Sequence, residues 1–325
     1  MIRWGILSTA RIAERIVDGA RLAEGAEIVA VGSRDLARAR AYADEHGIAR
    51  AHGSYEGLLE DPDVDAVYVP LPNALHVEWS VRALEAGKHV LCEKPMTRDP
   101  AQVDAAFDAA ERAGRVLMEA FMWRFHPQTE ALVRLVRSGA VGELRFVRAA
   151  FGFNLPWLEN VRWDPALEGG ALMDVGCYGV SALRLICGAE PERVHGEQIE
   201  TSGVDARFAG VLRFPGGVLG AFDCGMDVAR REHIEVVGSE ATIHVPAPWQ
   251  APEPLILVTR EGEPERIVPE AVDPYARELE EMGRAIAGGE PPRLGRDDAL
   301  GQARAIAALY RSAAEGLAVP VVSGG

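Results

Sequence analysis

Short apolar runs alternate with segments of helical periodicity over the first 120 residues of the chain. Apolar residues at i, i+3 and i+4 predict helices, and short runs rich in valine and isoleucine predict buried strands. The predicted strands are 3–7, 28–31, 64–69, 89–91 and 116–119, and the predicted helices are 12–24, 36–46, 75–86 and 100–113. This alternation indicates an α/β domain, in which a parallel sheet is covered by helices on both faces.

The pattern changes after residue 121. A helix at 125–138 and a strand at 143–153 come first, and Gly169-Gly170 starts another helix. Strands then follow at 205–214, 218–225, 233–238, 241–245 and 255–259, before helices at 275–287 and 298–315. Pro215-Gly216-Gly217 suits a hairpin turn between the first two of these strands. We therefore expect an α+β domain with a large, open, mostly antiparallel sheet at 123–325, after a first domain at 1–122. The last two helices are expected to pack back on the first domain.

Composition narrows the class of protein. The chain has 325 residues, 48% of them hydrophobic, which suits two globular domains. A net charge of -15 and no basic run argue against nucleic acid as a partner. The four cysteines form no CxxC pair and no cluster with histidines, so we expect reduced thiols, a cytoplasmic location and no metal. The opening MIRWGILSTA reads as a strand and not as a signal peptide, and we expect no apolar run long enough to span a membrane.

The segment Glu93-Lys94-Pro95 follows directly on an apolar strand. Proline cannot continue a ladder, so the strand must stop there. Ligands of open α/β sheets bind at the carboxyl ends of the strands, and Lys94 supplies a flexible amine at that place. The alternative is a solvated loop pair without chemistry.

The turn after the first strand is where a dinucleotide-binding (Rossmann-type) domain carries G-x-G-x-x-G/A. Here it reads Ser8-Thr9-Ala10-Arg11-Ile12-Ala13, so both leading glycines are replaced. The helix that follows still offers N–H groups and a positive dipole end to a diphosphate, and Ser8 and Thr9 add hydroxyl donors. The alternative is a βαβ unit that binds no nucleotide.

The end of the second strand indicates which dinucleotide is bound. Where an NAD site would place an acid for the ribose hydroxyl, the chain has Ser33 and Arg34, with Arg38 one helical turn further on. A hydroxyl and guanidinium groups suit a 2′-phosphate, which favours NADP, while NAD stays possible. Asp35 is the competing acid, but a role as helix cap fits it better.

Pro70-Leu71-Pro72-Asn73 follows the strand at 64–69 and stiffens a loop at the same edge of the sheet. His76 comes directly after it. This histidine either lines a nicotinamide pocket or is a first-turn helix residue without chemistry.

These segments together resemble the Gfo/Idh/MocA oxidoreductase family, in particular its branch of dimeric dihydrodiol dehydrogenases and NADP-dependent D-xylose 1-dehydrogenases. Five segments carry the resemblance: residues 4–13, residues 70–76, Glu93-Lys94-Pro95, residues 119–127 and residues 169–178. It covers essentially the whole chain. The replaced glycines depart from the general family pattern, but Ser-Thr-Ala is similar to what this branch carries.

The resemblance implies roles for individual residues. Tyr178 is the expected proton-transfer residue, Asp174 orients it or the substrate, and Lys94 lowers the pKa of the phenol, with the two domains meeting across a cleft. Trp123 and Arg124, whose alternative is plain packing and surface exposure, would flank the nicotinamide. The expected cofactor-binding residues are Ser8, Thr9, Ala10, Arg11, Ile12, Ser33, Arg34, Arg38, Pro70, Leu71, Asn73, His76, Glu93, Lys94, Trp123 and Arg124. The expected substrate-binding residues are Lys94, Trp123, Phe153, Arg162, Asp174 and Tyr178, with Trp157 and Trp163 as further candidates. For Phe153, Trp157, Arg162 and Trp163 the alternative is hydrophobic packing of a loop.

The expected function is therefore an NADP-dependent dehydrogenase that moves a hydride between the nicotinamide and a hydroxyl of a sugar or polyol-like substrate. Dihydrodiols, inositols and sugar phosphates are alternative substrates, and Arg162 is the residue to examine for a phosphate. A non-catalytic NADP-binding sensor and a glucose–fructose-type oxidoreductase that keeps its cofactor are alternative functions. The family uses the free face of the open sheet to associate, so we expect a homodimer or homotetramer.

Overall fold

The computed structural model describes residues 1–156, 160–251 and 253–322 and divides into two compact units. Unit 1 comprises Met1–Phe125 and Asp273–Leu300, and unit 2 comprises His126–Val272 and Gly301–Gly325. The assignment of nucleotide binding to residues 1–122 and of substrate binding to residues 123–325 stays a prediction.

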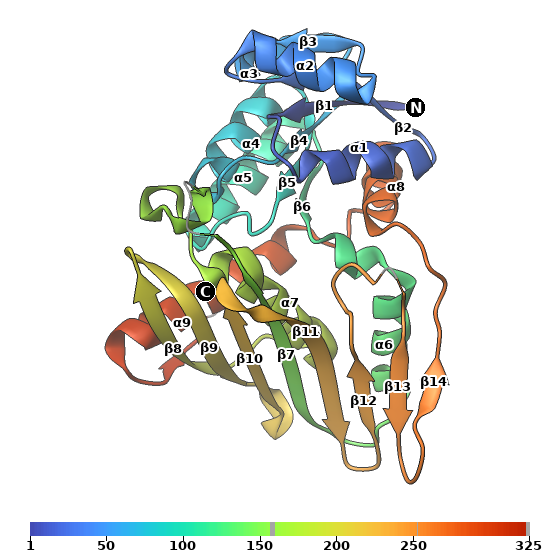
Figure 1. Ribbon diagram of the computed structural model, residues 1–325, viewed down its shortest axis with the longest axis vertical. Helices are drawn as coiled ribbons and strands as arrows, with labels where there is room; N and C mark the ends of the chain where they lie inside the picture. The colour runs from blue at the N-terminus through green and yellow to red at the C-terminus, as the bar shows by residue number, and fades with distance from the viewer. Residues whose placement is uncertain (157–159, 252, 323–325) are drawn as a thin grey trace. The chain divides into compact units, whose positions relative to one another are not determined.

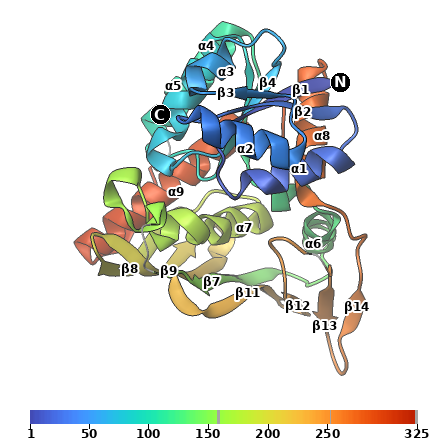
Figure 2. The same cartoon turned by 45° about the horizontal axis from the view of Figure 1, so that its top comes forward.

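Unit 1 is built on a six-stranded parallel sheet with the order β3-β2-β1-β4-β5-β6 (Figure 1). Its strands are β1 (Ile2–Leu7), β2 (Ala26–Gly32), β3 (Arg50–His52), β4 (Ala66–Val69), β5 (His89–Glu93) and β6 (Leu117–Ala120). Its helices are α1 (Ala13–Leu22), α2 (Leu36–His46), α3 (Tyr55–Leu59), α4 (His76–Glu85), α5 (Pro100–Ala113) and α8 (Pro274–Ile286), with short 3-10 turns η1 (Asn73–Leu75) and η2 (Met122–Phe125). Figures 1 and 2 show α1 with α8 on one face of this sheet and α4 with α5 on the other. The predicted doubly covered parallel sheet is thus confirmed, and β3 and α3 are additions that the sequence analysis missed.

Strong local signals fix two helices of unit 1. The Asp35 carboxylate caps α2, because it accepts hydrogen bonds from the backbone N–H groups of Ala37 and Arg38. Asp99 caps α5 in the same way, Pro100 occupies its first turn, and Gly114 ends it in the left-handed conformation. The capping role predicted for Asp35 is therefore confirmed.

Unit 2 is built on a nine-stranded sheet with the order β14-β13-β12-β11-β7-β10-β9-β8-β15. Its strands are β7 (Leu144–Asn154), β8 (Arg193–Thr201), β9 (Val204–Arg213), β10 (Leu219–Gly225), β11 (Asp227–Gly238), β12 (Thr242–Val245), β13 (Ile256–Thr259), β14 (Glu265–Ile267) and β15 (Val319–Pro320). Its helices are α6 (Pro127–Arg137), α7 (Cys177–Cys187) and the part of α9 (Arg296–Glu315) that begins at Gly301, with 3-10 turns η3 (Val161–Trp163), η4 (Pro165–Leu167) and η6 (Pro215–Gly217) and a π-helical turn η5 (Leu172–Gly176). Neighbouring strands are antiparallel apart from β7 and β10, which run parallel, so the predicted mostly antiparallel sheet is confirmed.

The two faces of this sheet differ. Helix α7 packs on β7 and β10, and the second half of α9 lies under β8, where Gly196 N donates to Ser312 Oγ at 3.0 Å. In Figure 1 the sheet is seen from its other face, which no described helix covers. Alternate residues on that face are exposed, among them the apolar side chains of Phe146, Ile199, Val211 and Leu219. Unit 2 therefore presents a partly apolar sheet face.

The two last helices do not behave alike. Helix α8 lies in unit 1 and packs against α1, as predicted, whereas α9 contributes only its first residues, up to Leu300, to that unit. Its remaining turns belong to unit 2 and cover the sheet there. The contacts of α8 agree with the prediction that both helices pack on the first domain, and for the turns of α9 after Leu300 it stays a prediction.

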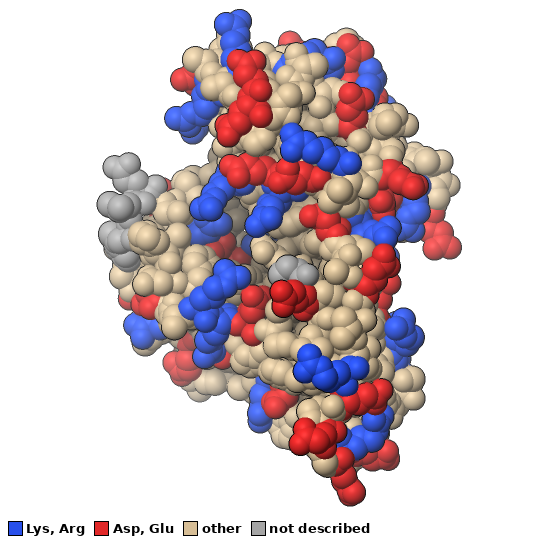
Figure 3. Space-filling view, turned by 45° about the vertical axis from the view of Figure 1, so that its right-hand side comes forward, with Lys and Arg blue, Asp and Glu red and all other residues tan. Residues whose placement is uncertain are grey.

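One helical segment corrects a sequence expectation. Pro165–Cys187 is long and apolar enough to cross a membrane by length and composition, although no such run was expected. Within its most apolar window, 83% is buried inside the protein, as in the core helix of a soluble protein. Figure 3 shows acidic and basic side chains interspersed over the face in view.

The contact between α1 and α8 depends on a close approach at Gly19. A Cβ added there would lie 2.8 Å from Tyr275 Cβ and 3.0 Å from the backbone nitrogen of Ala276. Gly283, within α8 itself, is different, because its nearest neighbour would be Ile2 Cδ1 at 3.6 Å, which is ordinary contact.

We predict that Gly19→Ala destabilises the protein by about 1–2 kcal/mol, because overpacking outweighs the gain in helix propensity. Gly283→Ala is the matched control, and it should stabilise the protein by roughly 0.5–1 kcal/mol, since alanine suits a helix interior better than glycine. Urea unfolding of the two variants beside the wild type measures both effects. Equal midpoints for the two variants would contradict the described α1–α8 packing.

Candidate functional site

The carboxyl ends of the unit 1 strands lie along one edge of the parallel sheet. Most of the predicted cofactor-binding residues directly follow these ends: Ser8 after β1, Ser33 and Arg34 after β2, Pro70 after β4 and Lys94 after β5. The topological switch lies between β1 and β4, whose neighbours on either side are β2 and β5. This is the edge at which open α/β sheets bind ligands.

The turn that carries Lys94 is held by buried polar groups. Tyr68 in β4 donates its hydroxyl hydrogen to Glu93 Oε1, and Glu93 Oε2 accepts from the Lys94 N–H at 3.1 Å. The Lys94–Pro95 peptide bond is cis. Glu119 in β6, which is buried, accepts the Met96 N–H at 2.7 Å. Carboxylates from two adjacent strands thus fix the backbone on both sides of Lys94.

His76 fixes the same turn from a third side. Its side chain is 1% exposed, with Nδ1 2.9 Å from the Pro95 carbonyl and Nε2 2.7 Å from the Leu71 carbonyl. Burial lowers the pKa of His76 to about 4, although both carbonyls act in the opposite direction. We conclude that His76 joins the Pro70–Asn73 loop to the Lys94 turn, whereas a direct part in a nicotinamide pocket stays a prediction.

Glu278 on α8 adds a further acid to this region. The residue is 1% exposed, and its Oε1 has no hydrogen-bond partner within the described part of the chain. Burial raises its pKa well above the ordinary value, and the neighbouring charge of Glu93 acts in the same direction. Glu278 is therefore held in its neutral form near Glu93.

The turn after β1 keeps the backbone shape of a glycine without having one. Ser8 has φ +139°, a region that favours glycine, and its Oγ accepts from the Ala10 N–H at 2.9 Å. Helix α1 follows without any side-chain cap at its amino end. The replaced fingerprint thus retains a sharp turn into a helix whose first N–H groups are not taken by a capping side chain.

The groups after β2 suit a phosphate better than a ribose diol. Ser33 is buried, and Arg34 and Arg38 are exposed. Burial raises the pKa of Tyr55, and the positive charges of Arg34 and Arg38 both act in the opposite direction. The acid at this position, Asp35, is already engaged as the cap of α2.

The segment after β6 is less accessible than the sequence suggested. Trp123 is fully buried, so its packing role is established and its contact with a nicotinamide stays a prediction. Arg124 lies over the Trp123 ring and pairs with Asp298 at 3.4 Å, within unit 1. Thr9, Ala10, Ile12 and Asn73 are partly exposed, and Arg11 is exposed.

The predicted substrate residues of unit 2 gather around the start of α7. Tyr178 is buried, and its ring lies 5.4 Å from that of Phe151 and 5.3 Å from that of Trp249. Phe153, two residues along β7, has its ring 6.4 Å from the Phe151 ring. These aromatic contacts fix the Tyr178 ring, and Phe151 and Trp249 are neighbours that the sequence analysis missed.

Two further predicted residues form an ion pair. Asp174, in the π-helical turn before α7, lies with its Oδ1 2.8 Å from Arg162 Nε. Trp163 is buried, which supports its packing alternative, and Trp157 lies outside the described residues.

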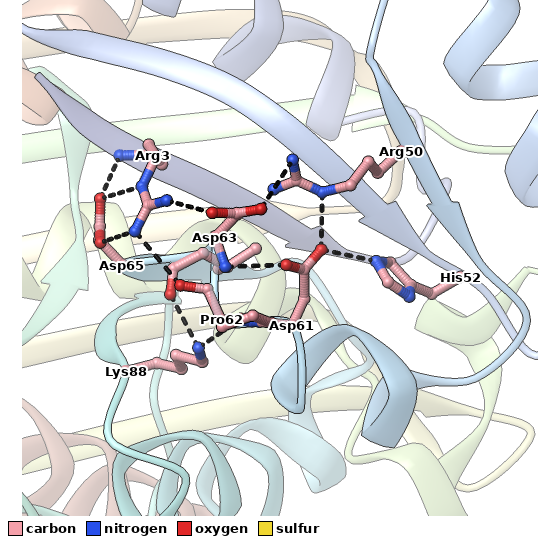
Figure 4. Close-up of polar contacts among 9 residues, drawn as sticks. Arg3, Arg50, His52, Asp61, Pro62, Asp63, Asp65 and Lys88 are labelled. Atoms are coloured by element: carbon pink, nitrogen blue, oxygen red, sulfur yellow. Dashed lines mark hydrogen bonds and ion pairs between the residues drawn. The ribbon is translucent and has the colours of Figure 1, made fainter.

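The opposite, amino edge of the unit 1 sheet is closed by a polar cluster (Figure 4). The Asp61 carboxylate accepts from Arg50 Nε at 2.7 Å and contacts His52 Nε2 at 3.0 Å, while Arg3 pairs with Asp65 at 2.8 Å. Burial by itself raises the pKa of Asp61, but these hydrogen bonds and that of the Asp63 N–H outweigh it, so that the pKa is lowered. Lys88 donates to the carbonyls of Asp61 and Val64 at 2.7 and 2.8 Å. The cluster is mutually paired and joins strand ends, so we assign it a structural role.

Among the described residues, no three histidine, cysteine, aspartate or glutamate side chains gather as a metal ion would require. The four cysteines are free, and burial raises the pKa of Cys187 to about 12 and that of Cys92 in the same direction. The thiols of Cys187 and Cys92 therefore stay protonated at neutral pH.

The sequence analysis missed Tyr68, Glu119 and Glu278. A weak signal exists for the first two, because each is the polar residue of an otherwise apolar strand, β4 or β6. Glu278 lies on an amphipathic helix among other acids and carries no such signal.

We predict that Glu278→Gln changes the pH dependence of stability. Above the ordinary glutamate pKa of 4.5, the unfolded chain loses the proton that the folded protein keeps, so wild-type stability falls as pH rises toward neutral. Each pH unit in this window lowers the free energy of unfolding by about 1.4 kcal/mol, and glutamine removes this dependence. Urea unfolding at pH 5 and pH 7.5 measures it: the stability of the variant relative to the wild type should rise with pH. A constant difference would contradict the burial of a protonated Glu278.

Comparison with known proteins agrees with this geometry. Residues 2–121 match the family model described as an oxidoreductase family with an NAD-binding Rossmann fold, and residues 129–244 match the GFO/IDH/MocA C-terminal domain. The chain is 42% identical to a D-xylose 1-dehydrogenase (NADP(+)) of Haloferax volcanii, over 97% of this chain and 98% of that protein.

Two solved structures are similar over nearly the full length. An aldose-aldose oxidoreductase from Caulobacter crescentus, complexed with glycerol, has a TM-score of 0.92 and 29% identity, covering 98% of this chain and 99% of that one. A 3-ketoreductase from Actinomadura kijaniata, in complex with NADP and TDP-benzene, has a TM-score of 0.91 and 34% identity, covering 96% and 97%. With both of its units matched, the chain belongs to the Gfo/Idh/MocA family of oxidoreductases.

Proposed function

We propose that this protein is an NADP-dependent dehydrogenase that oxidises a hydroxyl of a sugar or polyol-like substrate, with C1 of an aldose as the first candidate. The observation that carries the proposal is the Lys94 turn at the carboxyl end of β5, which Glu93, His76 and Glu119 hold from three sides. The relative from Haloferax volcanii, named as an NADP-dependent D-xylose 1-dehydrogenase, supports the substrate and the cofactor.

The residues present fit NADP. The amino end of α1 has no side-chain cap and suits a diphosphate, and the guanidinium groups of Arg34 and Arg38 suit a 2′-phosphate. NAD would need an acid there, and Asp35 is engaged as a helix cap. The remaining cofactor residues predicted from the sequence keep their proposed roles, and use of NAD as a second cofactor stays open to test.

When bound, NADP supplies the hydride acceptor, and the chain handles the proton. Tyr178 is the proposed proton acceptor. Its burial against Phe151 and Trp249 disfavours a charged phenolate, so proton transfer at neutral pH requires a cation that acts on this phenol. The proposal assigns that role to the Lys94 ammonium, and it assigns to Asp174 the orientation of Tyr178 or of a substrate hydroxyl.

The use of lysine in the sequence supports this assignment. Of 34 lysines and arginines, only Lys88 and Lys94 are lysines, and they precede and follow the same strand, β5. Lys88 is buried and bonded to backbone carbonyls. Lys94 is partly exposed, at the edge where ligands bind. A lysine can lose its proton or act as a compact point charge, which an arginine cannot do.

Two alternative functions remain as outcomes of the test. A non-catalytic sensor would bind NADP without turnover. An oxidoreductase of the kind named for the Caulobacter crescentus structure, acting on two aldoses, would be purified with its nucleotide already bound.

We also propose that the protein forms a homodimer or homotetramer through the uncovered face of the unit 2 sheet, where Phe146, Ile199, Val211 and Leu219 are exposed. A second copy would bury these side chains. Sedimentation velocity at micromolar concentration tests this, and a monomer would contradict it.

Four free cysteines support a reducing compartment, and we propose the cytoplasm.

We predict that the purified enzyme reduces NADP in the presence of D-xylose or another aldose. Lys94→Ala should lower kcat/KM by about 10³-fold, within the range of acid–base catalysis. Lys94→Arg should rescue little, because a guanidinium replaces the compact ammonium. Initial rates over aldoses, inositols and dihydrodiols, with NADP and NAD separately, provide the measurement.

In the same assay, Arg34→Ala tests the assignment of NADP as cofactor independently of the catalytic role proposed for Lys94. It should raise KM for NADP about tenfold, which corresponds to roughly 1.4 kcal/mol, and leave KM for NAD unchanged. Arg40→Ala, which removes an exposed arginine within α2, is the matched control. NADP binding without turnover of any substrate would favour the sensor, and turnover with NAD alone would refute the role of Arg34.

A further inference from the structure

Arg162 is the residue that the sequence analysis singled out for a substrate phosphate, and the structure pairs it with an acid instead. Arg162 Nε lies 2.8 Å from Asp174 Oδ1, and the side chains are 42% and 11% exposed. Both residues belong to unit 2, Arg162 in η3 and Asp174 in η5. A largely buried carboxylate thus faces a half-exposed guanidinium.

The backbone around Arg162 is built to hold it there. Asn160 Oδ1 accepts the Arg162 N–H at 3.1 Å, and the Arg162 carbonyl accepts the Gly170 N–H at 3.0 Å. A Cβ on Gly169 would lie 2.3 Å from that same carbonyl oxygen, so only glycine allows this approach. The Gly169-Gly170 pair therefore closes the loop of Arg162 onto the turn that precedes α7.

The backbone of Asp174 is fixed as well. The buried Asp205 of β9 accepts the Leu172 N–H at 2.7 Å and the Tyr310 hydroxyl at 2.8 Å. Gly170 has φ +116°, and a Cβ there would lie 2.1 Å from Asp205 Oδ1. Asp174 N donates to the Gly170 carbonyl at 2.9 Å. Both members of the ion pair thus sit on backbone that the fold fixes independently, so the pair is preorganised.

This arrangement changes what Arg162 offers to a substrate. A phosphate brought to its guanidinium would also approach the Asp174 carboxylate, which repels it. Asp174 and Tyr178 are four residues apart on consecutive helical turns and so share a face. The charge-balanced pair therefore borders the proposed proton-transfer residue.

We propose that Arg162 is a positioning residue, not an anion-binding one. It holds Asp174 beside Tyr178, and the balanced charge of the pair makes the enzyme select an uncharged polyhydroxy substrate over a phosphate ester or a nucleotide-linked sugar. This inference rests on the proposed function and deepens it. It separates the chain from the Actinomadura kijaniata ketoreductase, whose structure holds TDP-benzene.

The activity test compares D-glucose with D-glucose 6-phosphate, which share the reacting C1 hydroxyl. The wild type should prefer the uncharged sugar at least tenfold in kcat/KM. Arg162→Gln should lower kcat at least tenfold with little change in KM, and Arg162→Lys should recover part of this loss by restoring the cation. Arg260→Gln, which breaks the exposed pair of Arg260 with Glu265 in the β13–β14 hairpin, is the control and should leave kcat unchanged.

A binding test does not depend on turnover. Calorimetric titration of the full-length wild-type protein with inorganic phosphate should show no binding that depends on Arg162. Asp174→Asn should create such binding, and the Asp174→Asn/Arg162→Gln double variant should lose it. Phosphate binding by the wild type that Arg162→Gln abolishes would overturn the proposal, as would a preference for the phosphorylated sugar or equal kcat for Arg162→Gln and Arg260→Gln. If the wild type turns over no aldose, inositol or dihydrodiol of the wider panel, the proposed function fails, and the titration still decides the role of Arg162.

Discussion

The proposed site depends on one constraint, the fixing of the polypeptide on both sides of Lys94. Proline ends β5, and the chain must then turn while its backbone groups stay paired in a largely buried place. Glu93 supports the start of the turn and is itself bonded by Tyr68, while Glu119 supports its end. His76 joins the turn to the loop after β4. The flexible side chain of Lys94 thus extends from a fixed backbone. A catalytic ammonium requires such a backbone, because it must be positioned against the reacting group.

Two buried acids lie close enough in unit 1 to repel each other, and burial favours the neutral form of one of them. Glu278 lies close enough to Glu93 for their charges to interact, and two buried carboxylates side by side would repel. Burial raises the pKa of Glu278 and so favours its protonated form, in which the side chain fills space without a second negative charge. The lysines at the two ends of β5 differ in their surroundings. Lys88 donates hydrogen bonds to backbone carbonyls, whereas Lys94 lies at the edge of the sheet where ligands bind.

Local signals in the sequence were sufficient for much of the fold. Asp99, Pro100 and Gly114 gave α5 its observed bounds, and Asp35 gave the start of α2. The short strand β3 was missed because it is Arg-Ala-His, with no apolar pattern, and its existence depends on pairing with β2. Strand β8 was missed because most of its outward residues are polar, Ile199 being the apolar one, and because Gly196 interrupts it.

The sequence predicts a site residue where the residue type itself indicates its chemistry. It does not predict which side chains are buried or paired, because packing determines this. Lys94 and Arg34 follow from position and type, and Asp174 follows from the resemblance to the family. The burial of Trp123 and of His76 does not, because exposure is set by elements distant in sequence. The pairing of Arg162 with Asp174 likewise depends on the close approach that Gly169 permits. At Ser8 the fingerprint lost its glycine, but the backbone kept the conformation that glycine favours, which no residue pattern reveals.

In the proposed reaction, a hydride moves from the substrate carbon that bears the hydroxyl to the nicotinamide. Mass spectrometry of the nucleotide after turnover with a C1-deuterated aldose tests this most directly. The account predicts one deuterium on C4 of the reduced nicotinamide and a lactone as the other product. Reduced nucleotide without deuterium, or deuterium released to water, would contradict it.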